Sequence, residues 1–566
     1  MWFCLKMQKM NSMKFNVLTI LLCLSIYGCG HAQLAINQEK IEATDQLFKR
    51  WATAQTPGAV MGLISKGELI YSKGYGAANL EHSIPNTVST AFNIASNTKQ
   101  FTAACISILN LRGELRFNQT LDEFFPDFPP YAKEVTVQHL LHHTSGLRDF
   151  SQITYLSGLR PDDYYDDSDI LEWIGSQKEL NFSPGEKFMY ANSNYWLLGQ
   201  IVQKVSGMPL SSFAKQEIFT PLNMSNTQFK DDNTNIIKNR AFGHSPNRSG
   251  GYRWIHSMLE HTGNGGIYTS VEDLAKWDKE FYTRKIFKDQ FWETMMTQGI
   301  LNNGEVIPYA KGLIMGNHHG IKTMDHGGRA PGYQSNIIRF PEEEFTIILL
   351  SNTSAINASQ LSYQIADIFL EAKIVQASPI PTPERKKISL TTKQLEGLVG
   401  SYWNRDKAFS RKIVLQEGVL QYQRSRQNSH TLLPINATEF RMLDTPPGME
   451  VIVRFDKKEM LFSENGEVVE TFEQYRPIKY SVQELSAFTG KYFSNEINTY
   501  YELRLEKNDQ LLLLINGKPT VPLRPVMRNL FSSPIGVFQF SEDGKGRIGA
   551  FKVSTPRVKN LAFKKG

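Results

Sequence analysis

Cysteine is scarce in this chain. Its 566 residues include four cysteines, and three of them lie near the start, at Cys4, Cys23 and Cys29. Only Cys105 lies in the body of the sequence. This distribution excludes a framework of disulfide bonds, so large hydrophobic cores must stabilise the fold.

The chain also has little excess charge. It contains 62 basic and 56 acidic residues, which leave a formal net charge of +6, and no long basic block. We therefore expect no nucleic-acid partner. No apolar run after the first 32 residues is long enough to span a membrane. The content of hydrophobic residues (41%) and charged residues (21%) is typical of globular proteins, and the length indicates roughly two to four domains.

Residues 1–32 have the pattern of a secretory signal peptide. A lysine precedes an apolar run from Phe15 to Tyr27, and small residues follow it. We expect cleavage after Ala32; the alternative is that Cys29 is a lipid-attachment cysteine. The chain is therefore expected to be exported, as a periplasmic or secreted protein or as a membrane-anchored lipoprotein.

Residues 33–371 alternate helix-like and strand-like segments. The stretch "AVMGLISKGELIYSKGYG" predicts a hairpin with its turn at Lys66-Gly67. An apolar period after Phe101 predicts a helix that stops near Gly113. Two strands are predicted on either side of Pro341–Glu344, and "ASQLSYQIADIFLEAK" predicts a closing helix. Strands at both ends with helices between them indicate an α/β layer plus a helical region.

The rest of the chain contains an internal repeat. A proline-rich segment at residues 372–386 is predicted to be a linker. Beyond it, "LEGLVGSYW" and "LSAFTGKYF" recur at a constant offset of 90 residues. Two copies are too few for a solenoid, so we expect two small antiparallel β-barrels, at residues 387–478 and 479–566.

The motif Ser-x-x-Lys occurs twice, as Ser96-Asn97-Thr98-Lys99 and as Ser212-Phe213-Ala214-Lys215. About two matches are expected by chance, so only context can distinguish them. We interpret Ser212 as the N-cap of a helix. Ser96 opens an apolar-periodic run, and one helical turn places Lys99 beside it, where an amine could activate the hydroxyl.

The motif Tyr-x-Asn also occurs twice. Tyr190-Ala191-Asn192 lies in a loop that leads into a helix, whereas Tyr402-Trp403-Asn404 lies at the start of a repeat and is interpreted as packing. A tyrosine acts as a general base only if cations lower its pKa, and Lys99 is the candidate cation.

The motif His-x-Gly occurs three times, beginning at His261, His318 and His326. The first two matches are predicted to lie in turns. The third, His326-Gly327-Gly328, precedes the two late strands and is predicted to lie on or beside a sheet edge. Small residues there let a substrate backbone approach closely.

Taken in order, Ser96-x-x-Lys99, Tyr190-x-Asn192 and His326-x-Gly328 resemble the serine β-lactamase and penicillin-binding-protein superfamily, in its class C-type branch. Stretches such as "VTVQHLLHHTSGLRDF" and "GNGGIYTSVEDLAKW" are similar to the same superfamily. The resemblance covers residues 40–370. It implies an α/β (α+β) catalytic domain, with an antiparallel sheet and a helical region, followed by two lipocalin-like β-barrels. That architecture resembles D-aminopeptidases, which implies that a barrel loop reaches the catalytic cleft.

The resemblance also implies roles for individual residues. Ser96 would be the acylated nucleophile, Lys99 would carry its proton, and Tyr190 would be the base that also protonates the leaving group. Asn192 would orient the substrate amide. The remaining positions would complete the site: His326 would hold the tyrosine or the substrate, and Gly327, Gly328 and Arg329 would line it, with the N–H groups of Ser96 and Arg329 as the oxyanion hole.

One departure from the resemblance affects the expected substrate. β-Lactamases usually carry lysine where His326 stands, and the loss of a permanent cation favours esterase and peptidase members. We expect an exported serine hydrolase that forms an acyl-enzyme with D-amino-acid peptides or small esters. The alternatives are a β-lactamase, a D,D-carboxypeptidase, or a non-catalytic protein that binds peptidoglycan or another ligand.

No cofactor or metal is expected. The spacing of His139, His142 and His143 could suit a metal, but no acidic residue completes a zincin signature. The expected partner is a small-molecule or peptide substrate.

Overall fold

A computed structural model describes residues 37–160, 163–371, 388–425, 428–443, 445, 450–464, 466–507 and 509–566. The predicted signal peptide with Cys29 and the predicted linker at 372–386 lie outside the described residues. Within the described residues, no helix combines the length and the apolar composition needed to cross a membrane.

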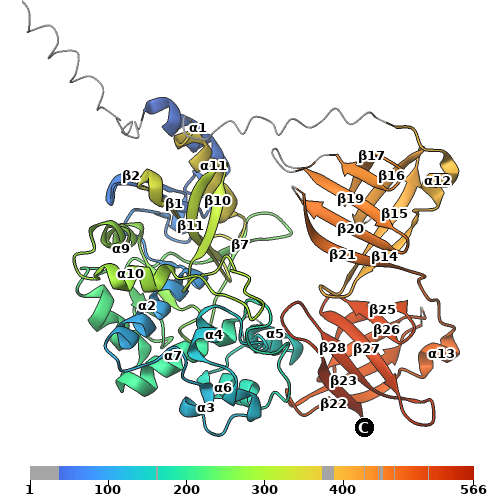
Figure 1. Cartoon of the computed structure of the whole chain (residues 1–566). Helices are drawn as coiled ribbons and strands as arrows, with labels where there is room; N and C mark the ends of the chain where they lie inside the picture. The colour runs from blue at the N-terminus through green and yellow to red at the C-terminus, as the bar shows by residue number, and fades with distance from the viewer. Residues whose placement is uncertain are drawn as a thin grey trace, which may run out of the picture.

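The first domain, which the sequence resemblance predicts to be catalytic and which is called the catalytic domain below, is built on one antiparallel sheet of six strands in the order β10-β11-β12-β13-β1-β2 (Figure 1). The predicted hairpin is confirmed, and positive φ angles at Lys66 and Gly67 form its tight turn. The predicted strands around Pro341 are also confirmed. The strands span β1 (Ala59–Ser65), β2 (Glu68–Tyr75), β10 (Ile314–His318), β11 (Ile321–Ala330), β12 (Tyr333–Phe340) and β13 (Phe345–Ser351).

Helices cover both faces of this sheet. Alternate residues of β1 point to opposite faces, so Met61 packs in the core beneath α1 (Gln38–Phe48) and α11 (Ala358–Phe369), while Val60 packs on the side of α9 (Val271–Thr283). β13 is buried along its whole length. Two-sided coverage explains why its centre, residues 347–350, is a run of four consecutive apolar residues instead of an alternating pattern.

A helical region lies below the sheet in Figure 1. Its central helix is α2 (Thr98–Leu111), of whose 14 residues 12 are buried, including the polar ones of its first turn. The other helices are α3 (Leu121–Phe124), α4 (Val137–Leu141), α5 (Phe150–Leu156), α6 (Asp167–Gly175), α7 (Asn192–Ser206), α8 (Leu210–Ala214) and α10 (Asp289–Met296).

Short elements connect these layers. Two of them are two-stranded sheets, one of β3 (Ala77–Asn79) and β4 (Ile84–Pro85) and one of β7 (His244–Pro246) and β8 (Tyr252–Trp254). A three-stranded sheet has the order β5 (Phe92–Asn93), β9 (Ile267–Thr269), β6 (Gln228–Phe229). The others are the short helical turns η1 (Lys49–Trp51), η2 (Ala95–Asn97), η3 (Pro130–Lys133), η4 (Lys215–Phe219) and η5 (Pro341–Glu343).

Two closed antiparallel barrels follow, each of eight strands and each preceded by a short helix. Barrel 1 comprises α12 (Thr392–Glu396), β14 (Gly400–Asn404), β15 (Phe409–Gln416), β16 (Val419–Ser425), β17 (Asn428–Pro434), β18 (Glu439–Met442), β19 (Val451–Asp456), β20 (Glu459–Glu464) and β21 (Glu467–Tyr475). Barrel 2 comprises α13 (Val482–Ser486), β22 (Gly490–Ser494), β23 (Thr499–Leu505), β24 (Leu511–Ile515), β25 (Lys518–Met527), β26 (Leu530–Ser533), β27 (Gly536–Glu542), β28 (Ile548–Ser554) and β29 (Leu561–Lys565).

The repeated sequence marks the closure of each barrel. The Tyr402 hydroxyl donates to the Leu398 carbonyl at 2.8 Å, and the Tyr492 hydroxyl donates to the Phe488 carbonyl at 2.9 Å. Each tyrosine thus ties the first strand of its barrel to the turn that follows the preceding short helix. The repeat is therefore a structural motif that each barrel needs.

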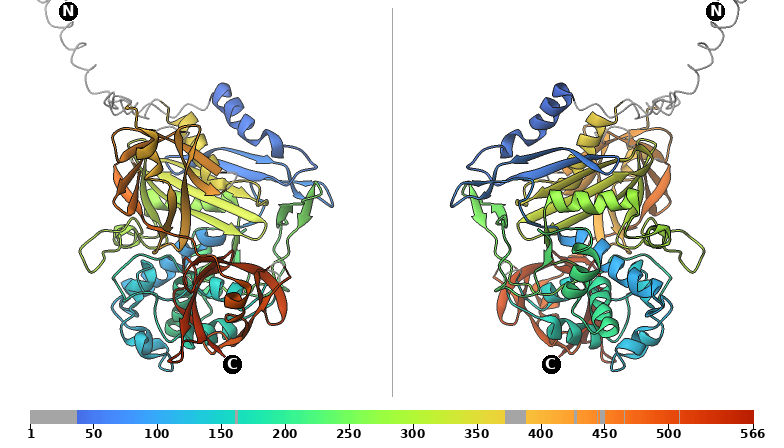
Figure 2. Two further views of the ribbon diagram at one scale, coloured as in Figure 1. Left: turned by 90° about the vertical axis from the view of Figure 1, so that its right-hand side faces the viewer. Right: turned by 90° about the vertical axis from the view of Figure 1, so that its left-hand side faces the viewer.

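Barrel 2 packs directly against the catalytic domain (Figure 2). Ile153 and Leu156 of α5 belong to the same buried cluster as the core of barrel 2, and the Tyr501 hydroxyl donates to the Leu156 carbonyl at 2.7 Å. Arg148 and Glu496 form a buried ion pair at 2.6 Å. A chain ending near residue 371 would therefore expose α5 and leave Arg148 unpaired.

Candidate active site

Ser96 lies in the turn η2, immediately before α2. The N-cap of α2 is Asn97, and the cap makes no side-chain hydrogen bond. Ala95 has φ of +48°, a left-handed conformation that is strained for a residue with a Cβ atom. This turn presents the half-buried Ser96 hydroxyl to the cleft instead of to the helix end.

Lys99 lies one helical turn further on and is completely buried. Its Nζ is 3.2 Å from Ser96 Oγ, and it donates to Asn192 Oδ1 at 3.0 Å and to the Asn264 carbonyl at 2.7 Å. Burial lowers the pKa of Lys99 well below its usual value, and this effect exceeds the opposing attraction of Asp149. A neutral amine with both N–H groups engaged keeps its lone pair for the serine proton.

Tyr190 and Asn192 flank the start of α7. Tyr190 hydrogen-bonds with Ser96, and its ring lies 4.9 Å from Lys99 Nζ. Burial raises the pKa of Tyr190, and Ser96 and Arg557 lower it only in part. The prediction that Lys99 acts as a cation lowering this pKa is therefore wrong, because burial disfavours both charged forms. The phenol stays protonated and can donate its proton.

Asn192 links the nucleophile to a buried carboxylate. It is the first residue of α7, and while its Oδ1 accepts from Lys99, its Nδ2 donates to Ser151 Oγ at 3.1 Å. The same Nδ2 is 3.4 Å from Asp149 Oδ2. These contacts fix the amide orientation.

The third motif lies on β11, as predicted. β10 pairs with β11 only as far as Asp325, so in the described sheet the edge beyond it lacks a strand partner on that side. A Cβ at Gly328 would lie 2.2 Å from the Ile94 carbonyl oxygen, so only glycine lets β11 approach the nucleophile turn. Arg329 is exposed at the rim of the cleft, beside Gly327.

His326 is buried and contacts Tyr309. Its Nε2 is 3.2 Å from the Tyr309 hydroxyl, and its ring centroid is 6.2 Å from that of Tyr190. Burial, followed by the proximity of Lys99, lowers the pKa of His326 to about 4. The imidazole is therefore neutral at pH 7 and supplies no cation to the site.

All eight predicted residues except Lys99 line one cleft of about 710 Å³, and Lys99 lies directly beneath it. Further lining residues were not singled out from the sequence: Phe150, Ser151, Tyr165, Lys230, Asn264 and Arg557. His261 was recognised only as a turn residue, yet it lines the cleft and its Nδ1 is 3.1 Å from Asn264 Oδ1. In the sequence, His261 lies two residues before the stretch "GNGG", which contains Asn264, and this closeness is the signal from which its place in the cleft could be predicted.

Arg557 enters the cleft from barrel 2. It lies in the turn between β28 and β29, its guanidinium is 4.8 Å from the centre of the Tyr190 ring, and its Nη1 donates to Asp149 Oδ2 at 3.1 Å. A barrel residue thus contacts Tyr190, which agrees with the loop expected from the resemblance. No sequence pattern identified this arginine.

The remaining motif matches lie elsewhere. Ser212 is inside α8, whose N-cap is Pro209, so its interpretation as an N-cap is wrong. Proline has no side-chain acceptor, and α8 accordingly has no side-chain capping hydrogen bond. The three neighbouring histidines have separate partners: His139 accepts from the Thr136 N–H, His142 contacts the Thr297 carbonyl, and His143 contacts Asn194.

Comparison with known proteins identifies the family of this chain. The family model described as Beta-lactamase matches residues 44–368, more than half of the chain. Penicillin-binding protein 4* of Bacillus subtilis (strain 168) is 28% identical over 399 residues, which are 66% of this chain and 85% of that protein. A D-aminopeptidase of Gluconobacter oxydans (strain 621H) is 26% identical over 360 residues, which are 63% of this chain and 65% of that protein.

A solved structure shows the same fold. The octameric penicillin-binding protein homologue from Pyrococcus abyssi superposes with a TM-score of 0.53 and 25% identity, over 77% of this chain and 100% of that chain. The matched family, the expected fold and the grouping of Ser96, Lys99 and Tyr190 point to the same chemistry. The chain therefore belongs to the beta-lactamase family and is a serine hydrolase of the β-lactamase and penicillin-binding-protein superfamily.

Proposed function

We propose that this protein hydrolyses amides or esters of small D-amino-acid peptides through an acyl-enzyme on Ser96. The observation that carries the proposal is the contact between Lys99 Nζ and Ser96 Oγ at 3.2 Å, with the pKa of the buried lysine lowered. A neutral amine at this distance is a competent base for a serine hydroxyl. We also propose that the protein is exported, because residues 1–32 have the sequence pattern of a signal peptide.

In the proposed mechanism, Lys99 Nζ takes the proton as Ser96 Oγ bonds to the substrate carbonyl carbon. The N–H groups of Ser96 and Arg329 stabilise the oxyanion. The bond to the leaving group then breaks, and Tyr190 donates its proton to the departing nitrogen or oxygen. Lys99 then gives the proton that it took from Ser96 to the Tyr190 phenolate. Water attacks the acyl carbonyl while its proton passes to the neutral Lys99 amine, and the departing Ser96 oxygen takes that proton from Lys99 as the acid product is released.

Two features support a D-amino-acid substrate. The similarity to a D-aminopeptidase supports this substrate class, and the neutral His326 offers no permanent charge for a β-lactam carboxylate. The exposed Arg329 at the rim favours the second candidate function, a D,D-carboxypeptidase or β-lactamase, since its guanidinium could bind a carboxylate. A panel of D- and L-aminoacyl p-nitroanilides, p-nitrophenyl esters and nitrocefin distinguishes these functions.

The decisive experiment compares Ser96→Ala with Ser212→Ala. Loss of a nucleophile lowers kcat by about 10⁶-fold in serine hydrolases, so Ser96→Ala should abolish turnover and fluorophosphonate labelling. Ser212→Ala, which removes the serine of the second copy of the motif and leaves Ser96 intact, is the control and should label normally. A peptide map that places the adduct on Ser212, or a folded wild-type protein that neither labels nor turns over any panel substrate, would show that the proposal is wrong.

A further inference from the structure

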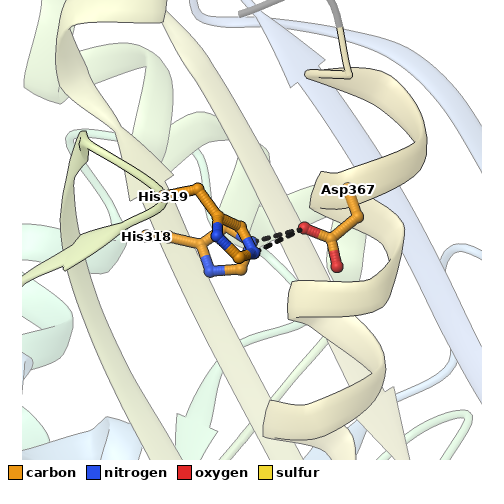
Figure 3. Close-up of side chains that lie close together, drawn as sticks. All are labelled: His318, His319 and Asp367. Carbon is orange, nitrogen blue, oxygen red and sulfur yellow. Dashed lines mark hydrogen bonds and ion pairs between the residues drawn. The ribbon is translucent and has the colours of Figure 1, made fainter. Parts of the chain in front are cut away.

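His318, His319 and Asp367 converge where the β10–β11 hairpin meets the end of α11 (Figure 3). His318 Nε2 is 2.6 Å from Asp367 Oδ1, and His319 Nε2 is 3.6 Å from the same oxygen. One ligand atom from each residue lies within 4.8 Å of the other two. Across the part of the chain that the structure describes, this is the one group of three such side chains.

The hairpin turn explains why two consecutive histidines point the same way. Successive strand residues normally point to opposite faces. Here His319 and Gly320 form the turn, with φ of +51° and +88°, and Asn317 Oδ1 accepts from the Gly320 N–H at 2.8 Å. The left-handed backbone returns the His319 side chain to the side of His318, and the two ring centroids are 4.2 Å apart.

Asp367 is placed where a cation is favourable. It lies in the last turn of α11, at the negative end of the helix dipole, where a carboxylate alone is destabilising. Tyr363, one turn earlier, packs its ring 4.8 Å from that of His318 and holds the imidazole in place. The side chain of His318 is 14% exposed, while those of His319 (43%) and Asp367 (44%) are open enough to admit an ion and water.

We propose that His318, His319 and Asp367 bind a zinc ion, with water as the fourth ligand. Two imidazole nitrogens and one carboxylate oxygen form a ligand set that zinc prefers over calcium or magnesium. Ligand atoms of a tetrahedral zinc site lie about 3.3 Å apart, given metal–ligand distances of about 2.0–2.2 Å. The separations of 2.6 and 3.6 Å lie on either side of that value, so small side-chain movements complete the site.

The site would stabilise the catalytic domain rather than take part in hydrolysis. It joins the turn between β10 and β11 to α11, whereas His326 and Arg329 lie further along β11, away from that turn. Zinc binding would therefore cross-link the hairpin to the closing helix without contacting the catalytic cleft. This inference does not depend on which substrate the protein hydrolyses.

Zinc titration of the untagged full chain after treatment with EDTA tests the proposal. We expect one equivalent of zinc to bind in calorimetry and the melting temperature to rise, because zinc binds the folded state. His319→Ala and Asp367→Asn should each weaken binding roughly tenfold or more and remove the gain in melting temperature. His82→Ala, at another exposed histidine, is the matched control and should bind as the wild type does.

Cobalt in place of zinc gives an independent readout, since a tetrahedral site produces strong visible absorption that His319→Ala should abolish. The proposal is overturned if no stoichiometric binding occurs, or if His319→Ala leaves the affinity unchanged. A melting temperature that responds to pH but not to zinc would also overturn it, because it would identify the cluster as an ion pair only.

Discussion

Barrel 1 and barrel 2 have the same topology, yet the catalytic domain uses them differently. Asp406 and Glu496 occupy corresponding positions 90 residues apart, after the first strand of each barrel. Glu496 is 5% exposed and pairs with the buried Arg148, whereas Asp406 is exposed and its carbonyl accepts from Lys559 of barrel 2. The same barrel position is thus buried in one copy and solvent-exposed in the other.

Docking explains this difference. Barrel 2 covers α5 and sends its β28–β29 turn toward Asp149, while barrel 1 packs on barrel 2 through a small cluster formed by Trp403, Val526, Leu530 and Val537. A buried carboxylate is tolerated only where a cation and hydrogen bonds accompany it, and the catalytic domain supplies both. The barrel fold allows either role, and its surface contacts decide between them.

The largest expected effect is a loss of stability at low pH that is greater in the catalytic domain than in either barrel. Burial lowers the pKa of His142, His261 and His326 to about 4, whereas an unfolded histidine titrates near 6.5. Between these values the unfolded chain binds more protons, so stability falls as pH falls from about 6.5 to about 4, by on the order of 2–3 kcal/mol for each histidine. After the predicted linker the sequence contains one histidine, His430.

Hydrogen exchange at about pH 7 and about pH 4.5 measures this difference by region. After correction for the intrinsic exchange rate, amides of the catalytic domain should lose protection before those of the barrels. Earlier loss in the barrels would contradict the histidine argument.

The next effect compares Glu496→Gln with Asp406→Asn. Removal of the Glu496 charge leaves Arg148 buried without its partner and should cost about 3–5 kcal/mol of unfolding free energy. Asp406→Asn, at the corresponding exposed position, should change stability by about 0.5 kcal/mol or less. Urea unfolding measures both, and similar losses in the two variants would mean that docking does not distinguish the barrels.

A smaller effect concerns catalysis. Arg557→Ala removes the cation above Tyr190 and leaves Asp149 without its ion-pair partner beside Asn192, so we expect kcat/KM to fall about 10–100-fold. Arg405→Ala, an exposed ion-paired arginine of barrel 1, should leave kcat/KM unchanged. Steady-state kinetics on one substrate measures both variants. Equal kcat/KM values for Arg557→Ala and Arg405→Ala would show that barrel 2 does not contribute to the active site.

The smallest effect should be shared by the two barrels. Tyr402→Phe and Tyr492→Phe each remove one hydroxyl that donates to a carbonyl, at 2.8 and 2.9 Å. Each should lower the unfolding free energy by about 0.5–1.5 kcal/mol. If thermal unfolding shows that only one substitution matters, the repeated tyrosine is not a common closure of the barrels.

Local patterns determined much of this molecule. The order of the three motifs, the glycine turn at Lys66-Gly67 and the helix after Ser96 could be predicted because they depend on residues close together in the chain. The 90-residue repeat predicted the barrels because each copy needs the same buried tyrosine and short helix. The approach of β11 to the nucleophile follows from Gly328, which sequence already marked as small.

Tertiary structure alone decided the protonation states of the site residues and the contribution of barrel 2 to the cleft. Whether Lys99 or Tyr190 carries charge depends on burial, which no short motif reveals. Arg557 is about 370 residues from Tyr190 in sequence and contacts it only because barrel 2 docks on α5. Asp367 joins His318 in the same way, through the packing of α11 on the sheet, since contacts between distant segments are set by packing and not by local pattern.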